Sequence, residues 1–280
     1  MELLDIPEDE YHADTTRISA SMIKMMHAKT PAHVYDAFFA PDREQPDSAA
    51  LDFGKMFHAA VLEPETFDDK YMVMPEGLDR RTNEGKALWA DIFASGKQAV
   101  ADNKFNDVKK MAANIHKLPI WSKIMANNPQ FEKTVRTDRK RIRMDIFVEP
   151  CDDFPRGLIG DLKSCADASP YRFGYDCHKF GYHIQAAYYR DTVFHASGFK
   201  PSFKPAFIIL ACEKTRPFVA KAYELGQIEI DIGWAIADYA YRNLFDCIKS
   251  NNWPGYGDEI EPIELPFFAY DDEEIFFGDE

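Results

Sequence analysis

The chain has 280 residues, a formal net charge of −14, a hydrophobic content of 46% and an aromatic content of 14%. This composition is typical of a globular protein with a substantial core, and no apolar run approaches the roughly 18 residues of a membrane span. The acidic N-terminus, M-E-L-L-D-I-P-E-D-E, lacks the basic region and apolar core of a signal peptide, so we expect a cytoplasmic protein with no membrane partner.

The five cysteines are scattered and form no C-x-x-C pair. This pattern argues against a disulfide framework, a zinc site and an iron–sulfur cluster. The chain also contains no G-x-x-x-x-G-K-[ST] loop, no G-x-S-x-G elbow and no H-E-x-x-H helix. We therefore expect chemistry that does not depend on ATP, a serine nucleophile or a zinc-protease site.

The negative charge is concentrated at one end of the chain. Residues 256–280 contain ten acids and neither Lys nor Arg, which leaves 37 acids against 33 bases in residues 1–255. This nearly balanced body removes the objection that so acidic a protein is unsuited to nucleic acid. We predict a single domain over 1–255 and an acidic tail over 256–280, which is either a solvated terminus or a contact for a basic partner.

Residues 11–128 are predicted to form a mostly helical part. Ser19 or Ser21 can cap a helix that begins at Met22, and the run L-D-F-G-K-M-F-H-A-A-V-L-E has the apolar spacing of a buried helix. His58 lies in that run. A histidine there is either a core residue with satisfied hydrogen bonds or a ligand, and the run alone leaves both interpretations open.

Residues 67–86 are expected to be irregular, and residues 86–128 to be helical throughout. The irregular stretch ends in R-R-T-N-E-G-K, which is either a solvated loop or a contact for a DNA phosphate, and the segment 133–143 is locally basic. The candidate DNA contacts from these two stretches are Arg80, Arg81, Thr82, Asn83, Arg141 and Arg143.

The stretch from Arg141 to Lys163 is predicted to form two paired strands. Alternation in R-I-R-M-D-I-F-V places Asp145 on the face opposite the aliphatic one, and in G-L-I-G-D-L-K-S it places Asp161 and Lys163 on a common face. The expected aliphatic face consists of Ile142, Met144, Ile146 and Val148. Two acids and a lysine suit a divalent-metal site for phosphodiester hydrolysis, whereas a salt-bridged polar face of a hairpin is the alternative.

Downstream, a helix is predicted over about 170–196, a central strand over 205–213 and a long helix over about 227–250. Within the first helix Gln185 and Tyr189 are i and i+4 neighbours, so their side chains share a face. Their amide and hydroxyl groups could serve a bound water or a phosphate, while a polar stripe at the helix edge is the alternative.

Four motifs therefore follow one another along the chain: G-x-x-x-H ending at His58, a strand aspartate at Asp145, D-x-K from Asp161 to Lys163, and Q-x-x-x-Y from Gln185 to Tyr189. This order resembles the RecB-like branch of the PD-(D/E)XK nuclease superfamily. Within that branch the chain is most similar to the RecE-type exonucleases, also called exonuclease VIII, of phage and prophage recombination systems. Supporting stretches are S-A-S-M, L-D-F-G-K-M-F-H-A-A-V-L-E-P-E, R-R-T-N-E-G-K and R-I-R-M-D.

The resemblance implies an α/β (α+β) fold. Its core would be a restriction-endonuclease-like central mixed β-sheet flanked by helices, over about 129–250, after the helical N-terminal part over about 11–128. It also implies that His58, Asp145 and Asp161 hold Mg²⁺ or Mn²⁺.

The remaining site residues are likewise implied by the resemblance. The backbone carbonyl of Leu162 would complete the metal ligands, and Lys163 would orient or activate the attacking water. Gln185 and Tyr189 would be supporting groups. Because His58 stands where many superfamily members have a carboxylate, the number of metal ions stays open.

The activity implied is ATP-independent 5′→3′ digestion of one strand of linear duplex DNA by a homo-oligomeric ring. The product would be a 3′ single-stranded tail for a single-strand annealing protein. Two other interpretations remain open: a structure-specific or restriction-like endonuclease, and a non-catalytic DNA-binding accessory protein of recombination.

Overall fold

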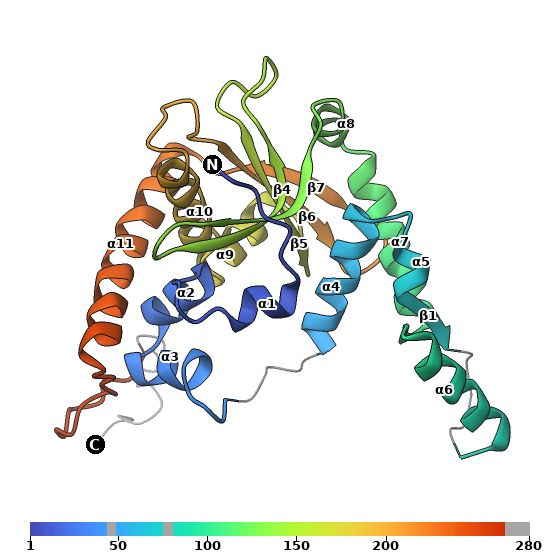
Figure 1. Cartoon of the computed structure of the whole chain (residues 1–280), viewed down its shortest axis with the longest axis horizontal. Coiled ribbons are helices and arrows are strands. Elements are labelled where there is room, and N and C mark those ends of the chain that lie inside the picture. The colour runs from blue at the N-terminus through green and yellow to red at the C-terminus, as the bar shows by residue number, and fades with distance from the viewer. Residues whose placement is uncertain (44–48, 75–80, 267–280) are drawn as a thin grey trace, which may run out of the picture.

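A five-stranded mixed β-sheet runs through the centre of the computed structural model, which describes residues 1–43, 49–74 and 81–266 (Figure 1). Its strands lie in the order β3-β4-β5-β6-β7. Their bounds are Gln130–Arg136 for β3, Arg141–Val148 for β4, Leu158–Cys165 for β5, Ala206–Glu213 for β6 and Ala220–Glu224 for β7. Strands β5 and β6 are parallel and the other neighbours are antiparallel, so the chain must cross over between β5 and β6.

Helices cover both faces of the sheet, on its left and right in Figure 1. The first group is α2 (Ala20–Ala28), α3 (Pro31–Phe38), α9 (Pro170–Lys179), α10 (Tyr182–Ala196) and α11 (Gln227–Ser250). The second group is α4 (Ala49–Leu62), α7 (Asp102–His116) and α8 (Pro119–Met125). None of the helices in the described ranges is long and apolar enough to cross a membrane.

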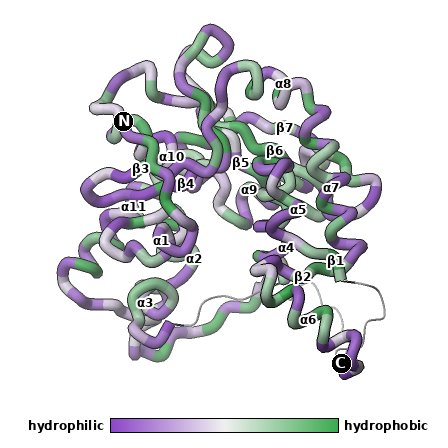
Figure 2. Tube along the Cα trace, turned by 45° about the vertical axis from the view of Figure 1, so that its right-hand side comes forward, coloured by the Kyte–Doolittle hydropathy of each residue, from purple (hydrophilic) through white to green (hydrophobic). Residues whose placement is uncertain are grey.

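Each face of the sheet has its own hydrophobic core. Ile159 and Phe207 belong to the first core, with α2, α10 and α11, whereas Leu162 and Leu210 belong to the second, with α4 and α7. Alternate residues of β5 and β6 thus point to opposite cores, and β6 is hydrophobic along most of its length (Figure 2). This architecture confirms the predicted α/β fold with a central mixed sheet and a helical N-terminal part.

The smaller elements correct two predictions. They are α1 (Glu8–Ala13), α5 (Phe67–Lys70), α6 (Asn83–Ser95), β1 (Tyr71–Met74) and β2 (Gln98–Ala101). The prediction of irregular structure over 67–86 and of continuous helix over 86–128 was wrong, because β1 and β2 pair in parallel as a separate two-stranded sheet. Strands of four residues are too short to show a clear period in the sequence.

The helix predicted over 170–196 is two helices, α9 and α10. The break falls at Phe180 and Gly181, and Gly181 has a φ of 64°, in the left-handed region that glycine enters without strain. The break allows α10 to start in a new direction and to pack against α2 and α11.

The alternation predicted that the aliphatic residues of β4 share one face, and this prediction was wrong. Ile142 and Met144 lie in the first core, whereas Ile146 and Val148 lie in the second. The face therefore switches at Asp145. The register places Glu132 of β3 across from it, and Glu132 has a φ of 53°, far from extended backbone. This local twist turns both carboxylates out of the regular pattern.

Candidate metal and active site

Strands β4 and β5 stop pairing in the middle of the sheet. Their backbone pairs run from Val148 and Leu158 to Ile146 and Gly160 and then end. Beyond that point the N–H of Leu162 donates to Oδ2 of Asp145 at 2.7 Å. A side-chain carboxylate thus takes the donor that a neighbouring strand would normally satisfy, and an opening forms between the two strands.

The D-x-K pair lies on the β5 side of this opening. Asp161 is 3% exposed, and its Oδ1 accepts a hydrogen bond from Nε2 of Gln185 in α10 at 2.7 Å. Its Oδ2 lies 2.6 Å from Nζ of Lys163. The ring of Tyr182 lies 5.1 Å from the same Nζ, so an acid and an aromatic face both hold the lysine.

His58 reaches the opening from the opposite layer. Helix α4 buries Phe57 and Val61 in the second core, and the imidazole of His58 lies against β4 and β5 at the opening. Its Nε2 lies 3.2 Å from the carbonyl oxygen of Leu162, and its Nδ1 lies 3.6 Å from Oδ2 of Asp145. The structure therefore brings His58, Asp145, Asp161, Lys163 and Gln185 together from four elements.

Glu132 is a further acid in the site that the sequence analysis did not find. Its Oε1 lies 3.8 Å from Nδ1 of His58, and its Oε2 accepts a hydrogen bond from Nε of Arg143 at 2.6 Å. Ligand atoms of His58, Glu132 and Asp145 all lie within 4.8 Å of one another. A register counted outward from the turn between β3 and β4, T-D-R-K at residues 137–140, would have placed Glu132 opposite Asp145 in advance.

The charges of these groups shift one another's pKa values. Burial lowers the pKa of His58, but the charge of Asp145 and the nearby carboxylate of Glu132 outweigh burial and raise it to about 9. Burial raises the pKa of Asp145 to about 6, with Asp161 and Glu132 adding to the rise and His58 opposing it. Burial also lowers the pKa of Lys163, but Asp161 and Asp145 outweigh it and raise that pKa overall.

This set of donors fits a hard divalent cation. Carboxylate oxygens, a backbone carbonyl and an imidazole are ligands of Mg²⁺- and Mn²⁺-type ions, and cysteine is absent from the cluster. Burial is the main cause of the raised pKa of Asp145, and the charges of Asp161 and Glu132 add to it, so the acids of the site repel one another. A cation among them would relieve that repulsion.

Tyr189 contributes less directly than its spacing indicated. It is buried in α10 one turn after Gln185, and its ring packs edge-on against Phe207 at 6.2 Å. In the part of the chain that the structure describes, its hydroxyl makes no hydrogen bond to Asp145 or Asp161. Its position is that of a packing residue behind the acids.

The predicted DNA contacts lie elsewhere or are already engaged. Arg141 is 2% exposed and donates to the carbonyl oxygen of Arg17 at 2.7 Å, so burial keeps it from DNA. Arg143 donates to Glu132 and to the carbonyl oxygen of Ile6.

The R-R-T-N-E-G-K stretch does not form a loop as a whole. Thr82 caps α6 by accepting from the N–H of Gly85 at 3.0 Å, and Asn83 is the first residue of that helix. Arg81 and Asn83 are exposed. Arg80 lies outside the described residues. Of these positions, Thr82 thus has a structural role as a helix cap.

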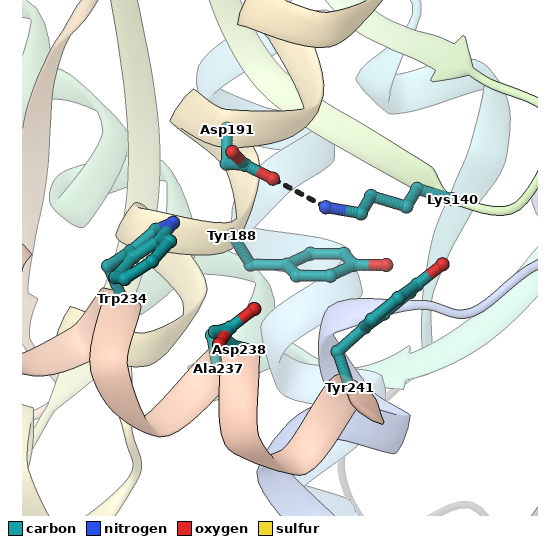
Figure 3. Close-up of a pocket in the computed structure, with 7 residues that line it drawn as sticks. All are labelled: Lys140, Tyr188, Asp191, Trp234, Ala237, Asp238 and Tyr241. Carbon is teal, nitrogen blue, oxygen red and sulfur yellow. Dashed lines mark hydrogen bonds and ion pairs between the residues drawn. The ribbon is translucent and has the colours of Figure 1, made fainter. Parts of the chain in front are cut away.

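In a separate pocket between α10 and α11, two charged side chains of the lining pair with each other (Figure 3). Its lining includes Lys140, Asp191, Tyr188, Tyr241 and Trp234. The ammonium of Lys140 pairs with Asp191 and lies 5.3 Å and 4.9 Å from the rings of Tyr188 and Tyr241. The pocket therefore already contains its own cation, and it shares no residue with the opening between β4 and β5.

Comparisons with known proteins agree with this fold. A family model described as "PDDEXK-like domain of unknown function (DUF3799)" matches residues 19–266. A crystal structure from Eubacterium rectale, described as a "putative exonuclease", has 15% sequence identity and a TM-score of 0.62, over 99% of this chain and 100% of that chain. At this identity the likeness shows the fold. No curated protein matches the chain in sequence.

Metal binding is expected to release protons. At pH 7 His58 carries a proton because its pKa is about 9, and an imidazole must lose that proton to bind a cation. Titration calorimetry with Mn²⁺ in buffers of different ionisation enthalpy should therefore show release of about one proton per ion. Affinity should rise with pH up to about 9 and fall more steeply below about 6, where Asp145 also gains a proton. Proton release near zero at pH 7 would contradict this arrangement.

Glu132→Gln is expected to weaken Mn²⁺ binding by roughly ten- to a hundredfold. It removes a negative charge that orients His58 and lies close to the ligand atoms of His58 and Asp145. Glu149→Gln is the matched control, since Glu149 is exposed just after β4 and loses the same charge. Calorimetry on both variants checks the effect, and equal affinities would show that Glu132 has no part in the site.

Proposed function

We propose, from the premise that the chain belongs to the PDDEXK-like family (DUF3799), that it is a metal-dependent, ATP-independent exodeoxyribonuclease of the RecE type. It digests one strand of linear duplex DNA from the 5′ end and leaves a 3′ single-stranded tail. The observation that carries the proposal is the convergence of Asp145, Asp161, Lys163 and His58 on the opening between β4 and β5. The shared fold with a protein described as a "putative exonuclease" supports it.

The residues proposed to hold the ion are His58, Asp145, Asp161 and the carbonyl of Leu162, with Mg²⁺ or Mn²⁺ as the occupant. When bound, such an ion supplies Lewis-acid stabilisation of charge on the phosphate and makes an attacking water more acidic. Glu132 positions His58 through Nδ1, which leaves Nε2 directed at the carbonyl of Leu162. The donor set therefore converges on the Leu162 side of the opening.

Lys163 and Gln185 have distinct proposed roles. Because its pKa is raised, Lys163 keeps its proton at neutral pH, so it is suited to stabilise the negative charge that develops on the phosphate. The proton of the attacking water then passes to solvent. Gln185 acts through Asp161: its amide holds Oδ1 in place and leaves Oδ2 toward Lys163 and the opening.

The partners of the enzyme are proposed on the resemblance to RecE-type exonucleases. Double-stranded DNA ends are the substrate, a homo-oligomeric ring is the assembly, and a single-strand annealing protein receives the 3′ tail. A ring that encloses DNA would keep the strand at the opening between β4 and β5 from one cleavage to the next.

Digestion of end-labelled linear duplex DNA with Mg²⁺ and without ATP tests the proposal. We expect mononucleotides from the 5′ end, and no cutting of covalently closed circles. Lys163→Ala and Asp161→Asn should each lower the rate by at least roughly a hundredfold, because each removes a charged group at the reacting phosphate. Lys221→Ala, at an exposed position of β7, is the control and should keep the rate.

Three outcomes would change the assignment. Cutting of closed circles would indicate an endonuclease, and DNA binding without any cleavage would indicate an accessory protein. Full activity of purified Lys163→Ala would place the active site elsewhere.

A further inference from the structure

Lys24 is a half-buried lysine of α2 that has no counter-ion among the described residues. Within residues 1–43, 49–74 and 81–266, no hydrogen bond or ion pair to its ammonium occurs, although most lysines that leave water acquire one. Exposed lysines of this chain pair readily, for example Lys55 with Glu8. An unpaired ammonium with restricted access to water is unfavourable for folding, so its place in the structure needs another explanation.

The stem of Lys24 lies against the turn that leads into α10. A Cβ atom at Gly181 would lie 3.1 Å from Cδ and 3.3 Å from Cγ of Lys24, so the glycine makes room for the lysine. The residue after this glycine is Tyr182, whose ring lies 5.1 Å from Nζ of Lys163. Lys24 and Lys163 therefore approach the same turn from α2 and from β5.

The electrostatics agree with this placement. Burial lowers the pKa of Lys24 to about 8, with the charge of Lys163 lowering it further and that of Asp161 opposing both. The ammonium of Lys24 thus senses both members of the D-x-K pair. Asp161 is already engaged by Lys163 and Gln185, so it does not neutralise the second lysine.

Asp161 and Asp145 act on Lys163, whereas Lys24 has no acid of its own among the described residues, and the start of α10 adds positive charge to the same region. Helix α10 has 15 residues, and its N-cap, Gly181, provides no side-chain cap, so the positive end of the helix faces the same region. Uncompensated positive charge of this kind attracts an anion. At a nuclease site the available anion is a phosphate of the substrate.

We propose that Lys24 binds a phosphate of the DNA strand next to the phosphate that is cleaved beside Lys163. The proposal rests on the nuclease function proposed above and adds a second phosphate subsite to it. The phosphate in this subsite is either the terminal 5′-phosphate or an internal phosphodiester. Both present the same anionic oxygens, and Lys24 thereby fixes the register of the strand by one nucleotide.

Lys24→Met tests the subsite, because methionine keeps an unbranched stem against Gly181 and removes the charge. Lys29→Met is the matched control at an exposed position at the end of the same helix. We expect Lys24→Met to weaken the binding of linear duplex in Ca²⁺ by about ten- to a hundredfold. In Mg²⁺ it should raise KM by a similar factor with little change in kcat. Lys24→Arg should recover most of the loss, and Lys29→Met should behave as the unaltered protein does.

Thermal unfolding separates this role from a structural one. Because Lys24 has no partner in the described part of the chain, Lys24→Met should unfold at the same temperature or higher. A clear fall in Tm together with weaker binding would instead assign Lys24 to the fold and overturn the proposal.

DNA carrying a neutral methylphosphonate next to the cleaved linkage identifies the phosphate. If the bound phosphate is an internal diester, this substrate should bind the unaltered protein as weakly as Lys24→Met binds ordinary DNA, and its binding to Lys24→Met should fall no further. If the bound phosphate is the terminal one, the substitution should leave the binding of both proteins unchanged. Ends with a 5′-phosphate and a 5′-hydroxyl distinguish the two sources: an effect of Lys24→Met that disappears on 5′-hydroxyl ends indicates the terminal phosphate, and one that persists indicates an internal diester.

Equal binding and equal KM for Lys24→Met, Lys29→Met and the unaltered protein would overturn the subsite while leaving the nuclease function in place. If the unaltered protein binds DNA but does not cleave it, the nuclease function fails and the binding measurements still decide the role of Lys24. If it neither binds nor cleaves DNA, both proposals fail.

Discussion

The hydrogen bond from the N–H of Leu162 to the carboxylate of Asp145 is the interaction on which the site depends. It occurs where β4 and β5 stop pairing, and it replaces a backbone acceptor with a side chain. Had the two strands remained paired along their length, the space that Asp145 and Asp161 face would be closed by backbone. The twist at Glu132 and Asp145 belongs to the same feature, because it moves the aliphatic residues of β4 from one core to the other.

The two cores explain why the site is assembled from both layers. α4 packs in the second core and brings His58, whereas α10 packs in the first and brings Gln185 to Asp161. The gap between the strands is where side chains from the two layers can meet. The balance of charge there is the second constraint: acids gather on the His58 side and lysines on the α10 side, so a cation and the phosphates of a DNA strand have complementary places.

The sequence predicted those parts of the site that follow from local periodicity. Asp161 and Lys163 are two residues apart on a strand, so they must share a face, and the motif order added His58 and Gln185. It did not reveal Glu132, because a glutamate with a φ of 53° breaks the alternation on which the analysis relied. It wrongly assigned Arg141 to DNA. The arginine is buried by contacts with Tyr11 and Arg17, and contacts between such distant segments leave no local pattern in the sequence. The short strands β1 and β2 were missed for the same reason, since only their mutual pairing defines them.

The location of a bound cation tests the central claim most directly. A crystal of the protein soaked with Mn²⁺ and measured near the manganese absorption edge gives an anomalous difference map that depends on no activity assay. The account predicts a strong peak in the opening between β4 and β5, within coordination distance of His58, Asp145, Asp161 and the carbonyl of Leu162. An empty opening at saturating Mn²⁺, or a peak held by other residues, would contradict it.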